Sequence, residues 1–240
     1  MTLLRPHIVG IAGTTCSGKS HLARYLMEIT PGNRPVIISS DSYYRDLSAL
    51  SPEEREDWNF DAPEAIEAEL LCHHLDTLAS GNEILCPVYD FTTHTRSTTS
   101  IRVTPGDLII VEGLFVLYWE EIRQLLNTKV FVLLTETASL ARRLERDVRE
   151  RGRTRQSVLN QYNRTVKPMT EKYVLPTSAF ADILVNGEDP IEQSSAEIIS
   201  LIQLVEVTPS TQRMKSIPNH LGPEGFHTST SGELLGSSLF

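Results

Sequence analysis

The 240-residue sequence has few cysteines, and they are not arranged as a framework. Cys16, Cys72 and Cys86 form no Cys-x-x-Cys pair, and none has a histidine at the spacing of a metal ligand. This pattern excludes a disulfide-dense scaffold and a cysteine-based metal site. It favours a protein of a reducing, intracellular compartment.

Long apolar runs and an excess of basic charge are also missing. The first apolar run begins at Ile8, covers six residues and contains glycine, which is too short for a signal-peptide core or a membrane span. The chain has 22 Lys and Arg against 31 Asp and Glu, a formal net charge of -9. We therefore expect a cytoplasmic protein with neither a membrane nor a nucleic acid as its partner.

What is present is typical of a globular domain followed by a polar tail. Apolar residues make up 40% of the chain and charged residues 22%. In 208–240, Ser, Thr, Gly and Pro account for 17 of 33 positions, which predicts a disordered tail. An alternative is that the apolar end of this tail docks on a partner. Residues 1–207 then suit one domain.

Short β-branched runs alternate with longer helical patterns through this domain. The runs 7–12, 36–39, 108–111, 130–134 and 183–185 are almost wholly apolar, as parallel strands covered on both faces are. Helices are predicted at 19–28, 63–79, 118–126, 138–151, 155–174 with an interruption at Pro168, and 191–204. The alternation predicts an α/β fold with a doubly wound, mainly parallel sheet.

One segment departs from the alternation. Two extended runs, 85–91 and 98–103, are separated by the polar link 92–97. This pattern predicts a β-hairpin inserted into the α/β domain. Because the sheet does not need such an insertion, we expect the hairpin to carry specificity rather than stability.

A phosphate-binding motif follows the first predicted strand directly. It has the form GxxxxGK[ST] and consists of Gly13, Thr14, Thr15, Cys16, Ser17, Gly18, Lys19 and Ser20. Glycines let backbone amides curl round phosphate oxygens, the lysine neutralises phosphate charge, and the terminal hydroxyl ligates Mg²⁺. The motif therefore predicts a P-loop NTPase that binds a nucleoside triphosphate and Mg²⁺, with Cys16 as a small filler.

Two carboxylates follow predicted strands at the same sheet edge. Glu112 comes directly after 108–111, where an acid beside the phosphate loop can hold Mg²⁺ or its water shell. Asp41 follows 36–39, a strand that we expect to lie next to the first strand. There Asp41 would accept the proton of a hydroxyl that attacks the γ-phosphate. The alternative is that Asp41 caps a turn.

Basic residues are concentrated in residues 142–172, here called the arginine-rich segment. It has ten Lys and Arg against four acids, a net charge of +6, which leaves -15 for the rest of the chain. Such a run is commonly a solvated helix face. A helical lid over the phosphates is the sharper interpretation, because arginines stabilise the charge of a transferred phosphoryl group.

The motifs exclude several classes of P-loop protein. The NKxD motif of guanine-reading GTPases is absent from the sequence. A transport ATPase would need a signature loop and a partner domain. Phosphoryl transfer to a small acceptor is the remaining prediction.

These motifs together resemble the uridine kinase family, also called uridine-cytidine kinases, related to phosphoribulokinase. The matching pieces over about residues 6 to 190 are GTTCSGKS, DSYYRDL, NFDAP, PVYDFTTHTR, VEG, RRLERDVRERGR and QYNRTVKP. PVYDFTTHTR and RRLERDVRERGR are the most specific of them. The turn Val185-Asn186-Gly187-Glu188 departs from the family by lacking an arginine.

The resemblance implies a role for particular residues. Tyr89 and His94 of the hairpin would contact a nucleoside base, and Phe91 would line its pocket. The other implied substrate contacts are Asp61, Arg143 and Gln161 to the ribose, and Tyr44 and Phe60 in the acceptor pocket. The implied catalytic and donor-phosphate residues are Asp41 as base, Lys19, Arg146, Arg151 and Arg153.

The function implied is transfer of the γ-phosphate of ATP or GTP to the 5′-hydroxyl of uridine or cytidine. The family also suggests a homo-oligomer, commonly a tetramer. Two alternatives stay open at this point. One is a kinase of another small acceptor, such as ribulose phosphate, pantothenate or nicotinamide riboside, and the other is a non-catalytic nucleotide-binding regulator.

Overall fold

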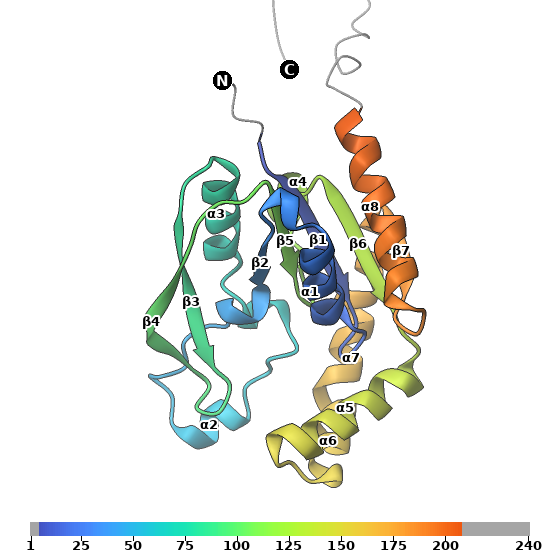
Figure 1. The fold of residues 1–240 in the computed structure, drawn as a ribbon. Coiled ribbons are helices and arrows are strands. Elements are labelled where there is room, and N and C mark those ends of the chain that lie inside the picture. The colour runs from blue at the N-terminus through green and yellow to red at the C-terminus, as the bar shows by residue number, and fades with distance from the viewer. Residues whose placement is uncertain (1–4, 208–240) are drawn as a thin grey trace, which may run out of the picture. The chain divides into compact units, whose positions relative to one another are not determined.

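The computed structural model describes residues 5–207, so the predicted tail at 208–240 lies outside the described residues. Within the described part, five parallel strands form the central sheet in the order β2-β5-β1-β6-β7 (Figure 1). The strands are β1 His7–Gly13, β2 Val36–Ser39, β5 Leu108–Glu112, β6 Thr128–Leu133 and β7 Ile183–Asn186. The predicted α/β sheet is confirmed, and the division of the chain at residue 207 stays a prediction.

The order of the strands corrects one expectation. β5 lies between β1 and β2, so the second strand does not neighbour the first. In the sheet register Glu112 pairs with Ile11 of β1 on one side and with Ser39 of β2 on the other. The carboxyl end of β5 therefore stands at the middle of the edge where ligands of open α/β sheets bind.

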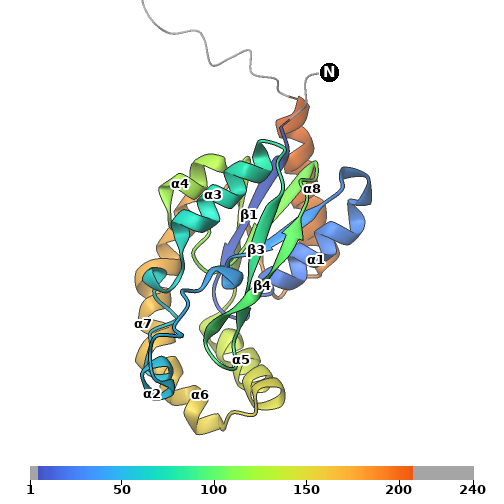
Figure 2. The same cartoon turned by 90° about the vertical axis from the view of Figure 1, so that its left-hand side faces the viewer.

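Helices cover both faces of the sheet (Figures 1 and 2). On one face, α1 (Lys19–Ile29) and α8 (Ile191–Val207) pack with side chains such as Val9 and Ile11 of β1. On the other face, α3 (Ala68–Ala79) and α4 (Glu120–Leu125) pack with Ile8 of β1. Alternate residues of one strand thus enter two separate apolar layers, which explains the almost wholly apolar strand sequences.

The inserted hairpin is present and stands beside α3 (Figure 2). β3 (Ile84–Asp90) and β4 (Thr95–Val103) pair antiparallel, with a register shift between Pro87 and Tyr89. Because β4 begins at Thr95, the turn is shorter than the predicted polar link. Threonine and serine are compatible with an exposed strand such as β4. Because they are polar, the first residues of this strand were assigned to the link instead.

The arginine-rich segment is helical. α5 (Glu136–Arg151) begins after the capping side chain of Thr135 and ends at Gly152, whose φ is 63°. α6 (Arg155–Gln161) follows, and then two π-helical turns, Tyr162–Val166 and Thr170–Val174, flank α7 (Lys167–Met169). The interruption predicted at Pro168 therefore takes the form of two widened turns rather than a break, because these turns accommodate a residue without an amide hydrogen.

Some short elements differ from the sequence-based prediction. The helix predicted at 63–79 divides into a 3-10 turn, Pro63–Ala65, and α3, because Ile66 is extended and bridges to Tyr44. The sequence analysis missed α2 (Pro52–Glu56), although a Ser51–Glu54 capping box marks its start. Three further 3-10 turns are Pro31–Asn33, Ser40–Tyr43 and Leu175–Phe180. Over residues 5–207, no helix has the length and hydrophobicity that a membrane crossing requires.

Gly113 allows the end of β5 to approach the turn that carries Asp41. A methyl group at this position would lie 2.8 Å from Cβ of Ser40 and in direct collision with its Oγ. We predict that Gly113→Ala lowers the free energy of unfolding by about 1–3 kcal/mol, because an overpacked site must shift its backbone. Urea denaturation monitored by circular dichroism measures this loss.

Gly32→Ala is the matched control, because an added methyl group there meets nothing within 4 Å. If both variants unfold at the same urea concentration as the parent, close packing at Gly113 does not constrain the Asp41 turn.

Candidate active site

The phosphate loop connects β1 to α1 and has the conformation that anion binding requires. Cys16 and Gly18 have φ values of 56° and 102°, so backbone amides turn inward where the chain curls. The side-chain hydroxyls of Thr14 and Ser17 are buried without a hydrogen-bond partner in the described structure. These two hydroxyls are enclosed by the protein, so the groups that fit the oxygens of a polyphosphate are the backbone amides of the curled loop at the helix N-terminus.

Lys19 closes this loop from inside. Its Nζ donates a hydrogen bond to the carbonyl oxygen of Thr14, over 2.7 Å, and the side chain is buried. Burial lowers the pKa of Lys19, whereas the nearby carboxyls of Glu112 and Asp41 act in the opposite direction. The ammonium group therefore lies close to both carboxylates that the sequence analysis selected.

Glu112 joins the phosphate loop to the end of β2. Its Oε2 accepts a hydrogen bond from Ser20 Oγ (3.0 Å) and its Oε1 accepts one from Ser39 Oγ (2.7 Å). A hydroxyl and a carboxylate beside a phosphate site suit Mg²⁺, which takes one or two protein oxygens and otherwise binds phosphates and water. Ser20 and Glu112 fit such an ion. Ser39 was not selected from the sequence, where only its place at a strand end marks it.

Asp41 lies in the 3-10 turn Ser40–Tyr43, directly after β2. Burial, and after it the nearby Glu112 carboxylate, raises the pKa of the Asp41 carboxyl to about 6, although Lys19 and, less strongly, two arginines act to lower it. No side chain caps this turn, so the alternative role of Asp41 as a cap has no support. A carboxyl poised near neutrality suits proton transfer.

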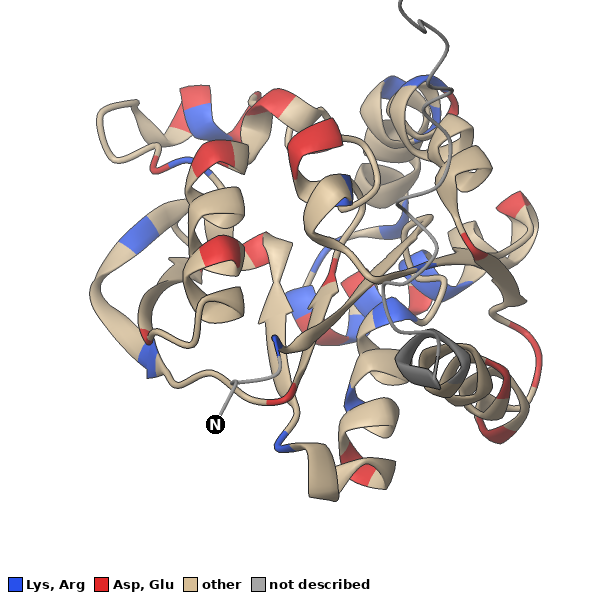
Figure 3. Cartoon of the chain, turned by 90° about the horizontal axis from the view of Figure 1, so that it is seen from above, with Lys and Arg blue, Asp and Glu red and all other residues tan. Residues whose placement is uncertain are grey.

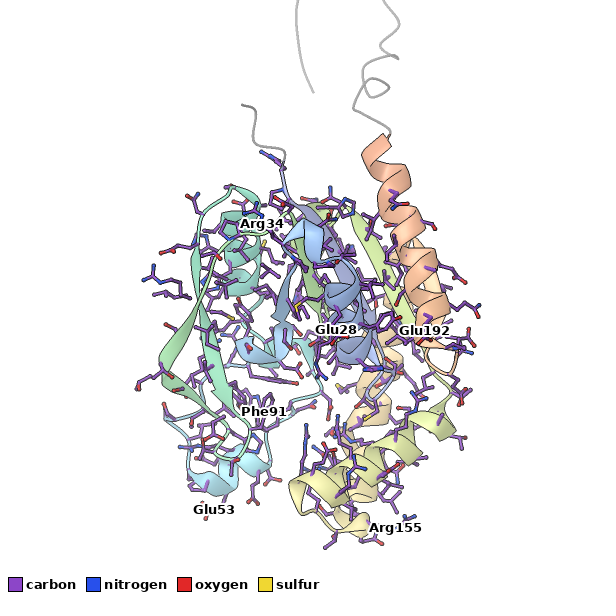
Figure 4. The ribbon with its side chains drawn as sticks, in the orientation of Figure 1. Glu28, Arg34, Glu53, Phe91, Arg155 and Glu192 are labelled. Carbon is purple, nitrogen blue, oxygen red and sulfur yellow. The ribbon has the colours of Figure 1, made fainter. Side chains whose placement is uncertain are left out.

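An aromatic pocket adjoins this turn. The Tyr44 ring lies 5.6 Å from that of Phe60 and 5.3 Å from that of Tyr89, measured between centroids. His94 stacks on Phe60 at 4.5 Å, and Phe91 contacts both tyrosines edge-on. Side-chain sticks show Phe91 at the hairpin end of the molecule, on the side facing α5 and α6 (Figure 4). The structure thus brings all five predicted acceptor-pocket aromatics together.

Two polar atoms in this pocket are left unsatisfied. Tyr89 OH and His94 Nδ1 are buried and have no hydrogen-bond partner in the described residues. Burial is the main cause that lowers the pKa of His94 and raises that of Tyr89 to about 12, so both groups are neutral at pH 7. Such groups between aromatic rings suit the polar edge of a flat heterocycle.

The three residues predicted to hold a ribose are only partly joined. Arg143 donates from Nη1 to Thr15 Oγ1 and from Nη2 to Gln161 Oε1, each over 3.1 Å. Asp61 instead accepts a hydrogen bond from Thr165 Oγ1 (2.8 Å). Thr165 was missed because a lone threonine in a helix carries no sequence signal. Arg143 thus links the phosphate loop to the helix that bears Gln161.

The remaining arginines surround a buried acid. Asp147 has no exposed surface, and its carboxylate lies 2.8 Å from Arg146 Nη2. The guanidinium groups of Arg143, Arg151 and Arg153 follow at 3.6–3.7 Å. When the ribbon is coloured by charge, several Lys and Arg positions (blue) lie together near the centre of the view (Figure 3). Asp147 was not selected, since a single acid within an arginine run reads as an ordinary helix-surface pair.

Arg142 is a fourth residue, after Ser39, Thr165 and Asp147, to which the sequence analysis assigned no role. It donates to the carbonyl oxygens of Cys16 (3.5 Å) and Gly187 (3.0 Å). The turn after β7, which lacks an arginine of its own, thereby receives one from α5.

One cavity of about 1520 Å³ brings most of the predicted site residues together, whereas Gly13, Thr14 and Ser17 of the phosphate loop do not line it. Its lining includes Thr15, Cys16, Gly18, Lys19, Ser20, Asp41, Tyr44, Phe60, Asp61, Tyr89, Phe91, His94, Glu112, Arg143, Arg146, Arg151, Arg153 and Gln161. A typical small-molecule pocket is about 300–1,000 Å³, so this cavity has room for two adjoining ligands. Phosphate-loop residues and arginines line one end of the cavity, and aromatic rings line the other.

A sequence profile of the Phosphoribulokinase / Uridine kinase family matches residues 8–189. The chain belongs to this family. A uridine kinase from Lactobacillus helveticus (strain DPC 4571) is 44% identical over 192 residues, which cover 79% of this chain and 91% of that protein. A uridine kinase from Deinococcus deserti is 41% identical over 203 residues, covering 83% and 98%.

Solved structures share the fold of this family member at low sequence identity. A putative fructose transport system kinase from Silicibacter sp. TM1040 is 19% identical with a TM-score of 0.64, over 76% of this chain and 91% of its own. Phosphoribulokinase from Rhodobacter spheroides is 17% identical with a TM-score of 0.60, over 78% and 74%. These matches agree with the α/β P-loop fold described above.

We predict that Lys19→Met weakens the binding of Mg·ATP at least tenfold. The methionine keeps most of the side-chain volume but removes the cation that the phosphate loop encloses. Isothermal titration calorimetry of the purified chain measures the change.

Lys129→Met serves as the control, since Lys129 pairs with Asp182 at the start of β6, whereas the phosphate loop lies near the end of that strand. An ATP affinity of Lys19→Met within twofold of this control would show that Lys19 does not contact the phosphates.

Proposed function

We propose that the protein is a uridine/cytidine kinase, which transfers the γ-phosphate of ATP or GTP to the 5′-hydroxyl of a pyrimidine ribonucleoside. One observation carries the proposal: Asp41 lies between a phosphate loop and an aromatic pocket with unsatisfied polar groups, within one cavity. The uridine kinases at 38–44% identity support the same acceptor.

The donor and its ion fit the phosphate-loop end. Residues 13–20 would hold the triphosphate, and Ser20 and Glu112 would hold Mg²⁺, which supplies charge neutralisation at the phosphates when bound. Lys19 and the arginines Arg146, Arg151 and Arg153 would stabilise charge on the transferred group. Their clustering round Asp147 supports this role, because it orients guanidinium groups before the ligand arrives.

The acceptor fits the aromatic end. Tyr89 and His94 would contact the base, with Tyr44, Phe60 and Phe91 as the apolar walls. Asp61, Arg143 and Gln161 would hold the ribose. The 5′-hydroxyl would then lie beside Asp41, whose carboxylate accepts its proton as the oxygen attacks phosphorus.

The alternative acceptors differ in the groups that they need. A sugar phosphate such as ribulose phosphate would call for cations at the aromatic end, where Tyr89, Phe91 and His94 present neutral rings. Cytoplasmic location and assembly into a homo-oligomer, by resemblance a tetramer, remain predictions of the sequence.

An acceptor panel tests the proposed function directly. The purified chain is incubated with Mg·ATP and, separately, uridine, cytidine, pantothenate, nicotinamide riboside or ribulose phosphate, and ADP formation is measured. We expect rapid ADP release with uridine and cytidine only. Turnover confined to another acceptor would reassign the substrate, and ATP binding without turnover would identify a regulator.

Asp41 is expected to determine the pH dependence of transfer. Its carboxyl must be deprotonated to act, and its pKa is about 6, so kcat/KM for uridine should fall about tenfold per pH unit below that value. Asp41→Asn should lower kcat at least a hundredfold at pH 7.5 and leave the affinity for Mg·ATP nearly intact. Steady-state kinetics from pH 5 to 8 and calorimetry provide both measurements.

Asp76→Asn removes the same charge from the exposed surface of α3 and should behave as the parent does. A kcat of Asp41→Asn within a few-fold of the parent would exclude Asp41 as the base.

A further inference from the structure

Arg96 connects the hairpin to the segment that bears Asp41. It belongs to β4, and its side chain donates from Nε to the carbonyl oxygen of Tyr44 (3.0 Å) and from Nη2 to that of Tyr43 (3.1 Å). Its third donor, Nη1, forms an ion pair of 2.8 Å with Glu67, just before α3. One half-buried guanidinium therefore joins three elements that are distant in sequence.

Two residues that Arg96 bonds to or pairs with, Tyr44 and Tyr89, line the acceptor pocket. In the hairpin register Arg96 pairs directly with Tyr89, one of the two unsatisfied polar residues of the pocket. Across the junction, Tyr43 is the last residue of the 3-10 turn that contains Asp41, and the Tyr44 ring contacts Tyr89. The guanidinium thus spans from the wall that faces the base to the turn that carries the carboxylate.

We propose that Arg96 is a positioning residue that sets the distance between the base-contacting hairpin and Asp41. This inference rests on the proposed nucleoside kinase function. A nucleoside contacts the two sides at once, its base at the hairpin and its 5′-hydroxyl near Asp41. Displacement of one side by about 1 Å can cost a hundredfold in rate, so a fixed junction matters more here than elsewhere on the hairpin.

The geometry requires arginine rather than positive charge alone. A guanidinium offers donors in a rigid planar fork, and here three of its nitrogens point to three acceptors in different directions. Lysine carries one nitrogen on a flexible stem and cannot reproduce this set. Arg96→Lys should therefore resemble Arg96→Gln rather than restore the function of the parent.

The same strand offers a matched control. Arg102 also lies on β4 and also pairs with an acid, Glu83, but both side chains are more than half exposed and lie away from the cavity. Arg102→Gln removes an equal charge from the hairpin and leaves the junction with the Asp41 turn unchanged.

The test compares Arg96→Gln, Arg96→Lys and Arg102→Gln with the parent, each as the full purified chain. KM for uridine, KM for ATP and kcat are measured, together with the Kd of uridine by calorimetry and thermal unfolding by circular dichroism. For both Arg96 variants we expect KM and Kd for uridine at least tenfold above the parent, with KM for ATP within twofold. Arg102→Gln should stay within twofold in every constant.

The outcomes separate positioning from a structural role. An unchanged KM for uridine in folded Arg96→Gln, an equal rise of both KM values, or full rescue by lysine would overturn the proposal. Failure of both Arg96 variants to fold would assign the residue to stability alone and overturn it too. If the parent neither phosphorylates nor binds a nucleoside, the proposed function itself fails, and this inference falls with it.

Discussion

The carboxylate of Glu112 is the contact on which the geometry of the cavity depends. It lies at the end of the strand that separates β1 from β2, and it accepts hydrogen bonds from a hydroxyl at the start of α1 and from another at the end of β2. A buried anion is tolerated only where donors and a counter-charge surround it. Ser20, Ser39 and Lys19 supply both. The phosphate loop and the Asp41 turn are thereby fixed relative to one another.

The arginine cluster applies the same principle with the signs reversed. Four guanidinium groups lie within 4 Å of the Asp147 carboxylate. Without this negative charge between them, the four positive charges would repel one another. Asp147 thus holds the four guanidinium groups together at one place, an arrangement that suits an anionic ligand. It also explains how a chain with a net charge of -9 concentrates positive charge at one end of a cavity.

Sequence patterns predicted the local structure better than the long-range contacts. Strands, the inserted hairpin and the phosphate loop were predictable because their signals lie within a few adjacent residues. The position of β5 between β1 and β2 was not, since neither apolar runs nor connection lengths specify which strand enters the middle of a sheet. Ser39 and Thr165 escaped notice for a related reason: each matters only through a partner distant in sequence.

The two widened turns on either side of Pro168 allow one helical run to contact both the cavity and the apolar layer of the sheet. Gln161, directly before the first turn, lines the cavity, whereas Val174, the last residue of the second turn, belongs to the apolar layer on one face of the sheet. A regular helix would keep one face in phase throughout, whereas a turn closed by i→i+5 bonds shifts the phase. The side chains before and after the widened turns therefore point in different directions from the helix axis. The run accommodates its own proline at 168, between the two widened turns, whereas a proline introduced elsewhere in it would remove a backbone hydrogen-bond donor and clash with the preceding turn.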